Sequence, residues 1–217
     1  MRNLYAEQLH SIDEGLVDMT RHVQQAVNRA THALLTADPH VADQVIGGDA
    51  QIDLFRDRIE DRVFEVLALQ QPVAGDLRML MAAVRMVADL ERMGDLAVHV
   101  AKVARMRMPE VAVPEQMMPT VRRMAEVAGQ MLGRLPAIIA ERDLDAVAQL
   151  EHDDEEMDQL RRQSFRVLLG DTWPHGVEPA IDIALVGRYY ERIADHAVTL
   201  ARRVVYLVTG EVSRSRP

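Results

Sequence analysis

Acidic residues spaced four apart are the feature of this sequence best suited to chemistry. They form two kinds of pair, Asp-x-x-x-Asp and Glu-x-x-x-Asp, and each kind occurs twice. The pairs are Asp49 with Asp53, Asp154 with Asp158, Glu91 with Asp95, and Glu191 with Asp195. On a helix, residues four apart lie on one face with Cβ atoms about 5–6 Å apart. Two such pairs on facing helices would place four carboxylates around one point.

Four converging carboxylates repel one another unless protons, arginines or cations lie between them. Hard cations such as Mg²⁺, Mn²⁺ or iron suit this role because they prefer oxygen ligands. Arg92 and Arg192, inside the Glu-x-x-x-Asp pairs, could neutralise the acids instead through salt bridges of modest strength. The chain has 34 acidic residues, so roughly five such pairs are expected by chance from helix-face arithmetic. The argument for a metal site therefore rests on the duplication of both kinds of pair.

Two histidines lie next to or within one helical turn of these pairs. His99 follows Asp95 by four residues and shares its helix face, which makes it a candidate extra ligand. His196 follows Asp195 directly and is expected to point elsewhere. A single helical histidine is more often a packing or surface residue than a ligand.

The elements that would position these residues are long amphipathic helices. Apolar residues recur every three or four positions, and no segment alternates as a strand would. Asp38-Pro39 and Asp143 are typical helix starts. The sequence therefore predicts an all-α protein of six long antiparallel helices, at about 4–36, 39–70, 73–107, 119–141, 144–169 and 177–209.

An internal repeat organises these helices. The segments Glu91–Ala101 and Glu191–Ala201 are identical at six of eleven positions without a gap, and the Asp-x-x-x-Asp pairs precede them in the same order. Coincidental similarity of two amphipathic helices is the alternative. The proline-rich stretch 108–119 separates the copies. We expect two tandem three-helix bundles, 1–110 and 111–217, related by a pseudo-twofold axis.

Composition excludes several classes of protein. The net charge of −9 argues against nucleic acid as a partner. No apolar run approaches the roughly 20 residues of a membrane span. The absence of cysteine fits a reducing compartment, and the first residues do not resemble a secretory signal. We expect a cytoplasmic protein that meets membranes only through partners.

Enzyme motifs are missing from the sequence. It contains no Gly-rich phosphate loop, no HExxH and no serine in a nucleophile elbow. Glu7 and His10 form one Glu-x-x-His, whereas a ferritin-like di-iron site needs two. These observations favour a protein that is not an enzyme. A carboxylate-bound metalloenzyme and a metal-free structural helical adaptor are the alternatives.

The repeated Glu-Arg-Met/Ile-Gly/Ala-Asp motif resembles that of the PhoU family of phosphate-signalling proteins, in its actinobacterial branch. The segment 69–78 and the Asp-x-x-Ile/Met-Asp pairs resemble that family too, and the resemblance covers about residues 4–209. Many members have Gly-Asp-His in the motif, where this chain has Gly94-Asp95-Leu96 and Ala194-Asp195-His196.

The resemblance implies a site and a role. It implies metal clusters on the bundle surface, with iron, manganese, magnesium or zinc as the candidate ions. The first cluster would use Asp49, Asp53, Glu91 and Asp95, and the second Asp154, Asp158, Glu191 and Asp195. It also implies a negative regulator of the phosphate-starvation response and of phosphate uptake. The implied partners are the ATPase subunit of the phosphate ABC transporter and a sensor histidine kinase, with a homodimer as a further candidate assembly.

Overall fold

The computed structural model describes residues 2–210, with side chains from residue 5 onward. This part of the chain forms six long α-helices, one short 3-10 helix and no strand. The elements are α1 (Arg2–Thr36), α2 (Pro39–Gln70), α3 (Ala74–Arg107), η1 (Glu115–Met117), α4 (Met118–Glu141), α5 (Leu144–Leu168) and α6 (Val177–Thr209). The predicted all-α class is confirmed, and every helix end lies within a few residues of its predicted position.

Local signals account for these helix ends. The side chain of Asp38 accepts a hydrogen bond of 3.1 Å from the backbone N–H of Val41, and Pro39 follows at the first helical position. Asp143 caps α5 in the same way, accepting from Ala146 at 3.0 Å. Each cap satisfies a donor that the helix itself leaves unpaired.

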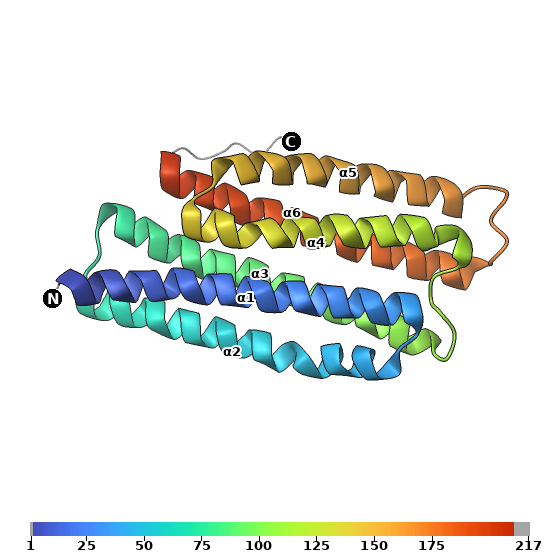
Figure 1. Cartoon of the computed structure of the whole chain (residues 1–217), viewed down its shortest axis with the longest axis horizontal. Helices are drawn as coiled ribbons and strands as arrows, with labels where there is room; N and C mark the ends of the chain where they lie inside the picture. The colour runs from blue at the N-terminus through green and yellow to red at the C-terminus, as the bar shows by residue number, and fades with distance from the viewer. Residues whose placement is uncertain (1, 211–217) are drawn as a thin grey trace.

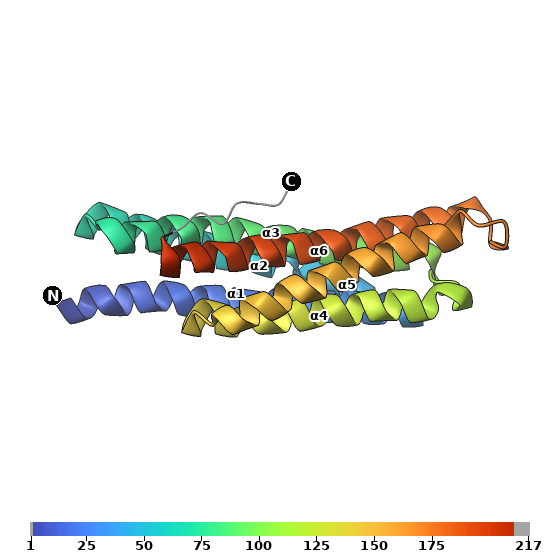
Figure 2. The same ribbon diagram turned by 90° about the horizontal axis from the view of Figure 1, so that it is seen from above.

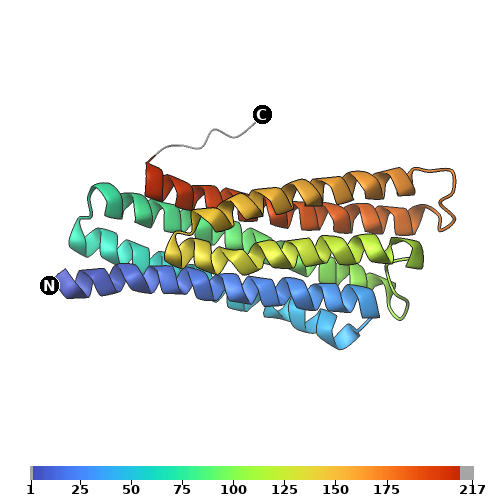
Figure 3. The ribbon, with the colours of Figure 1, turned by 45° about the horizontal axis from the view of Figure 1, so that its top comes forward.

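The helices form two antiparallel three-helix bundles lying side by side (Figure 1). The first contains α1, α2 and α3, and the second α4, α5 and α6. Helix α1 packs against α4, and α3 packs against α6, whereas α2 and α5 lie at the two outer edges (Figures 1 and 3). Seen from above, α3 and α6 occupy one layer and α1 and α4 the other (Figure 2). The tandem repeat of three-helix units is therefore confirmed.

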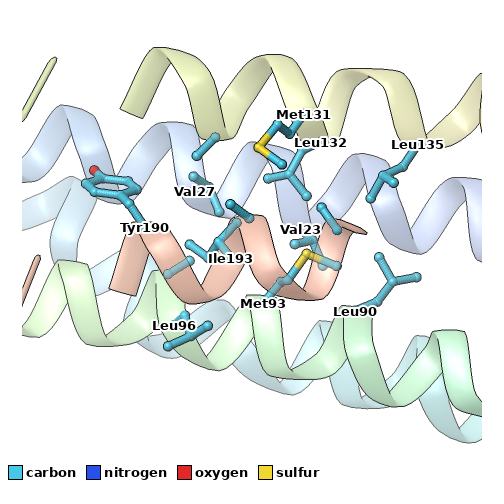
Figure 4. Packing of buried hydrophobic residues seen from close by; sticks show 14 of the residues in the cluster. Val23, Val27, Leu90, Met93, Leu96, Met131, Leu132, Leu135, Tyr190 and Ile193 are labelled. Atoms are coloured by element: carbon cyan, nitrogen blue, oxygen red, sulfur yellow. The ribbon is translucent and has the colours of Figure 1, made fainter. Parts of the chain in front are cut away.

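One apolar core runs through both bundles. Its side chains come from all four inner helices, as Figure 4 shows for Val23, Val27, Leu90, Met93, Met131, Leu132, Leu135, Tyr190 and Ile193. Small and flexible residues fill most of it, and Tyr190 is its largest fully buried side chain. The Tyr190 hydroxyl lies 2.7 Å from Thr31 Oγ1 of α1, so its polar end is satisfied. The predicted division at residue 110 is not tested by this shared core and stays a prediction.

Buried ion pairs join α3 to α6. Asp89 of α3 is contacted by Arg203 at 2.9 Å and by His196 at 3.1 Å, both from α6. At the other end, Arg107 of α3 donates to the buried Asp182 of α6 at 2.5 Å. These contacts show that the two helices are antiparallel and cross near the middle of their repeated motifs. None of the helices within residues 2–210 is long and apolar enough to cross a membrane.

Candidate functional site

The first set of acidic residues lies between α2 and α3. Asp49 and Asp53 come from α2, and Glu91 and Asp95 from α3. Arg56 of α2 links them, because its Nη1 lies 3.0 Å from Asp53 Oδ1 and 3.6 Å from Glu91 Oε1. Burial raises the pKa of Asp49, and repulsion from Asp95 and then Asp53 adds to the increase. The structure therefore brings the four predicted residues of this set together.

The second set lies between α5 and α6 in the same arrangement. Arg161 of α5 reaches Glu191 of α6, with 3.1 Å between its Nη1 and Oε1. Burial raises the pKa of Asp154 to about 6, and repulsion from Asp195 and then Asp158 contributes. Burial, followed by the charge of Glu191, also raises the pKa of Asp195. The predicted residues of the second set therefore lie along one interface between α5 and α6, as those of the first set lie between α2 and α3.

The bridging arginines were missed by the sequence interpretation. Arg56 follows Asp53 by three residues, and Arg161 follows Asp158 by three, so the repeat itself contained this signal. Arg92, named in advance, does contact Asp95 at 3.1 Å, but its counterpart Arg192 forms no ion pair within residues 2–210. The charge-neutralising residue common to both halves is therefore the one that crosses between helices.

The histidines differ in their relation to the acids. The charge of His99 counteracts the increase in the Asp49 pKa, so His99 lies near the first set as predicted. Its ring also stacks on Tyr189 of α6, with 5.3 Å between ring centroids. His196 points to Asp89 instead and forms part of the contact between the bundles.

A small residue in the motif allows α2 and α3 to approach closely. A Cβ atom added at Gly94 would lie 2.6 Å from Cδ1 of Ile52, which is well inside contact distance. Ile52 lies between Asp49 and Asp53 in the sequence, so the close approach at Gly94 sets how near the two acidic pairs come. Ala194 is the equivalent residue in the second half.

The donor chemistry of both sets fits a hard cation. Each set offers four carboxylates and no soft ligand, which suits magnesium, manganese or iron. Burial, followed by repulsion from neighbouring carboxylates, raises the pKa values of Asp49, Asp154 and Asp195. Within residues 2–210, however, no three Asp, Glu or His side chains converge closely enough to hold a metal ion. Metal binding therefore stays a prediction.

The raised pKa of Asp154 predicts a pH-dependent stability. Its pKa of about 6 in the folded protein exceeds the ordinary 3.8. The folded state therefore binds the proton of Asp154 more tightly than the unfolded state does. The contribution of Asp154 to the stability of the folded protein falls as the pH rises from about 4 to 6. We expect Asp154→Asn to stabilise the metal-free protein at pH 7.5 by on the order of 1 kcal/mol, after allowance for solvent screening. The gain should shrink towards zero at pH 4.

Urea unfolding in the presence of a chelator, at pH 4 and pH 7.5, measures this difference. Glu155→Gln provides the matched control, because Glu155 is an exposed carboxylate on the same helix. Its effect should be small and nearly independent of pH. A variant Asp154→Asn that is less stable than the wild type at pH 7.5 would contradict the assigned cost of burying this charge beside Asp195 and Asp158.

The fold and the acidic residues together define an all-helical protein of two repeated three-helix bundles, each with one Asp-x-x-x-Asp and one Glu-x-x-x-Asp pair. Comparison of the sequence identifies the particular family. The chain belongs to the PhoU family, since the PhoU domain matches residues 16–104 and again residues 121–204. The family expected from the motifs is therefore confirmed, and the domain occurs twice, as the internal repeat predicted.

Relatives span the whole chain. The phosphate-specific transport system accessory protein PhoU homolog 2 of Mycobacterium tuberculosis is 45% identical over 210 residues, covering 97% of this chain and 99% of the relative. The homolog of Aquifex aeolicus is 37% identical, covering 95% and 93%. The crystal structure of PhoU from Pseudomonas aeruginosa superposes with a TM-score of 0.88 at 31% identity, covering 95% of this chain and all of that one. The mycobacterial similarity supports the expected actinobacterial branch.

Proposed function

We propose that this protein is a cytoplasmic negative regulator of the phosphate-starvation response and of phosphate uptake. It acts by contact with the ATPase subunit of the phosphate ABC transporter and with a sensor histidine kinase, and it is not an enzyme. Membership of the PhoU family and the names of its relatives, which are accessory proteins of phosphate-specific transport, support this role.

The exposure of the acidic sets is the observation that carries the proposal. The side chains of Asp53 and Asp158 are 46% and 50% exposed. An enzyme that used these carboxylates would be expected to enclose its reactants and exclude water. Glu91 and Glu191 are only 23% and 11% exposed, so each set has a covered glutamate and an aspartate that reaches solvent. An acidic surface of this kind is better suited to contact with other molecules.

Regulation by contact requires different affinities for different states of the partner. In this proposal the protein binds the transporter in the state that signals ample phosphate, and it then holds the kinase in its repressing state. A divalent or iron-type ion on each set of carboxylates would neutralise the repulsion and tie α2 to α3 and α5 to α6. The arginines Arg56 and Arg161 already contribute part of that role.

A metal-free adaptor is the second candidate. In residues 2–210 no three ligand-type side chains converge on one point, and arginines lie among the acids. In this alternative the acidic sets form salt-bridge networks that stiffen the bundles, and the same contacts with partners follow without any ion.

Deletion of the gene tests the regulatory role directly. We expect alkaline phosphatase to be expressed in phosphate-rich medium at the level otherwise seen only in starvation, because the kinase is no longer repressed. Expression from a plasmid carrying the wild-type gene should restore repression. Normal repression in a clean deletion strain would refute the proposed function.

A further inference from the structure

Exposed apolar side chains recur at equivalent positions in the two halves, outside the acidic sites. On α3 these are Leu77 and Met81, and on α6 they are Val177 and Ile181, exactly one hundred residues later in each case. Their exposed fractions range from 40% for Leu77 to 75% for Val177. We name the α3 pair patch A and the α6 pair patch B. Single exposed apolar residues need no explanation, but repeated pairs at matched positions indicate a contact surface.

Each patch extends onto the preceding helix. Leu69, in the last turn of α2, is 66% exposed, and Leu169, directly after α5, is 82% exposed. The two leucines lie at the same end of each hairpin but are not equivalent in the repeat, because matched residues on α2 and α5, such as Arg56 and Arg161, are 105 apart. Both hairpin ends, α2–α3 and α5–α6, therefore present at least three large apolar side chains to solvent, with Val73 as a fourth at the α2–α3 end. The hairpins close at opposite ends of the molecule (Figure 1).

The antiparallel crossing of α3 and α6 fixes the separation of the patches. The helices cross near Gly94 and Ala194, as the contact between His99 and Tyr189 also shows. Each patch lies about fifteen residues from that crossing, so the two patches are roughly 45 Å apart at 1.5 Å per residue. The pseudo-twofold axis of the repeat runs between them. Leu77 precedes Glu91 on α3 by about four helical turns. Patch A therefore lies on nearly the same face of α3 as Glu91.

Cations without partners accompany both patches. Arg78 and Arg85 lie on the exposed side of α3 beside Met81, and neither forms an ion pair with any residue from 2 to 210. Arg166, in the last turn of α5, is likewise exposed and without an ion pair in that range, although patch B also has the exposed acids Asp171 and Glu178 nearby. In a chain of net charge −9, uncompensated arginines beside apolar residues match a partner surface that is apolar and acidic.

We propose that patches A and B form one docking surface for a homodimeric partner. Each partner subunit presents an amphipathic helix whose apolar side chains, flanked by acidic residues, lie on one patch. The twofold axis of the partner coincides with the pseudo-twofold axis of this chain, so one chain bridges two subunits. This inference rests on the proposed function, because it assigns the surface through which the regulator contacts its partners.

Purified full-length protein should be titrated against the phosphate transporter and against the sensor kinase, each in nanodiscs, with stoichiometry from mass photometry. We expect one chain for each partner dimer. We expect about 100-fold weaker binding for Leu77→Glu/Met81→Glu and for Val177→Glu/Ile181→Glu. Each variant keeps only one of the two patches and so loses the increase in affinity that comes from binding at both sites at once. The variant that combines all four substitutions should show no measurable binding.

Leu54→Glu is the matched control, since Leu54 is 53% exposed on α2 and lies near the level of Gly94, midway between the two patches. Its binding should equal that of the wild type, and all variants should keep the wild-type urea midpoint. A stoichiometry of two chains per partner dimer would overturn the inference. So would a loss of binding by the variant of only one patch. So would patch-dependent binding to empty nanodiscs, or patch-dependent dimers of this chain. Wild-type protein that binds neither partner would refute the proposed function as well, whereas undiminished binding by the variants refutes the docking surface alone.

Discussion

Arg134→Ala is expected to lower the free energy of unfolding by about 3 kcal/mol. Arg134 of α4 forms an ion pair with Asp153 of α5, and the Asp153 side chain is only 7% exposed. Without the arginine, a buried carboxylate keeps only the side-chain amide of Gln149, which donates at 3.2 Å. Removing one partner of a buried pair is costly because the remaining charge stays out of water. In a chain of this length the melting temperature should fall by roughly 6–12 °C.

Two further variants separate this explanation from a general effect of losing arginine. Arg105→Ala removes an ion pair between Arg105 and Asp43, whose side chains are 50% and 59% exposed respectively. It should lower the free energy of unfolding by no more than about 1 kcal/mol. The double variant Arg134→Met/Asp153→Leu replaces the buried pair with apolar groups and should recover most of the lost stability. Urea unfolding at pH 7.5 measures all three. A double variant as unstable as Arg134→Ala would contradict the argument.

Most of the fold could be predicted because each helix carries its own local signals. The apolar spacing, the Asp38 and Asp143 caps and the repeated motif each act within a few turns of helix, and the structure confirms them. The contact between the bundles was not predicted. It depends on Asp89 and Asp182, which are buried although aspartate is usually exposed, and their arginine partners lie at least 75 residues away in the sequence.

The candidate site was predicted in outline. Helix spacing alone indicated that each pair shares a face, and in the structure Arg56 and Arg161 reach from one helix of each half to the glutamate of the other. Arg56 and Arg161 recur at matched positions, but the spacing of the acids alone does not indicate that these arginines reach across to the facing helix. The distances between carboxylates depend on side-chain rotamers and on any bound charge, and sequence spacing determines neither of these.

Glu91→Ala/Glu191→Ala is expected to abolish metal binding if ions occupy the two acidic sets as proposed. Each substitution removes one of four carboxylates, and it also removes the group that Arg56 or Arg161 contacts across the groove. Loss of an outer partner alone typically weakens a metal site by about 10–100-fold, and loss of a direct ligand should weaken it at least as much. Elemental analysis of the purified protein should therefore find ions in the wild type and only background in the variant.

Glu65→Ala/Glu155→Ala is the matched control, because both residues are exposed glutamates on α2 and α5 outside the acidic sets. It should retain the wild-type metal content. An equally low metal content in the wild type and in Glu91→Ala/Glu191→Ala would reject the proposed metal clusters and favour the metal-free adaptor. Repression of alkaline phosphatase in strains carrying each variant then shows whether the acidic sets regulate through an ion. A metal-free variant that still represses would assign the regulatory contact to the rest of the surface.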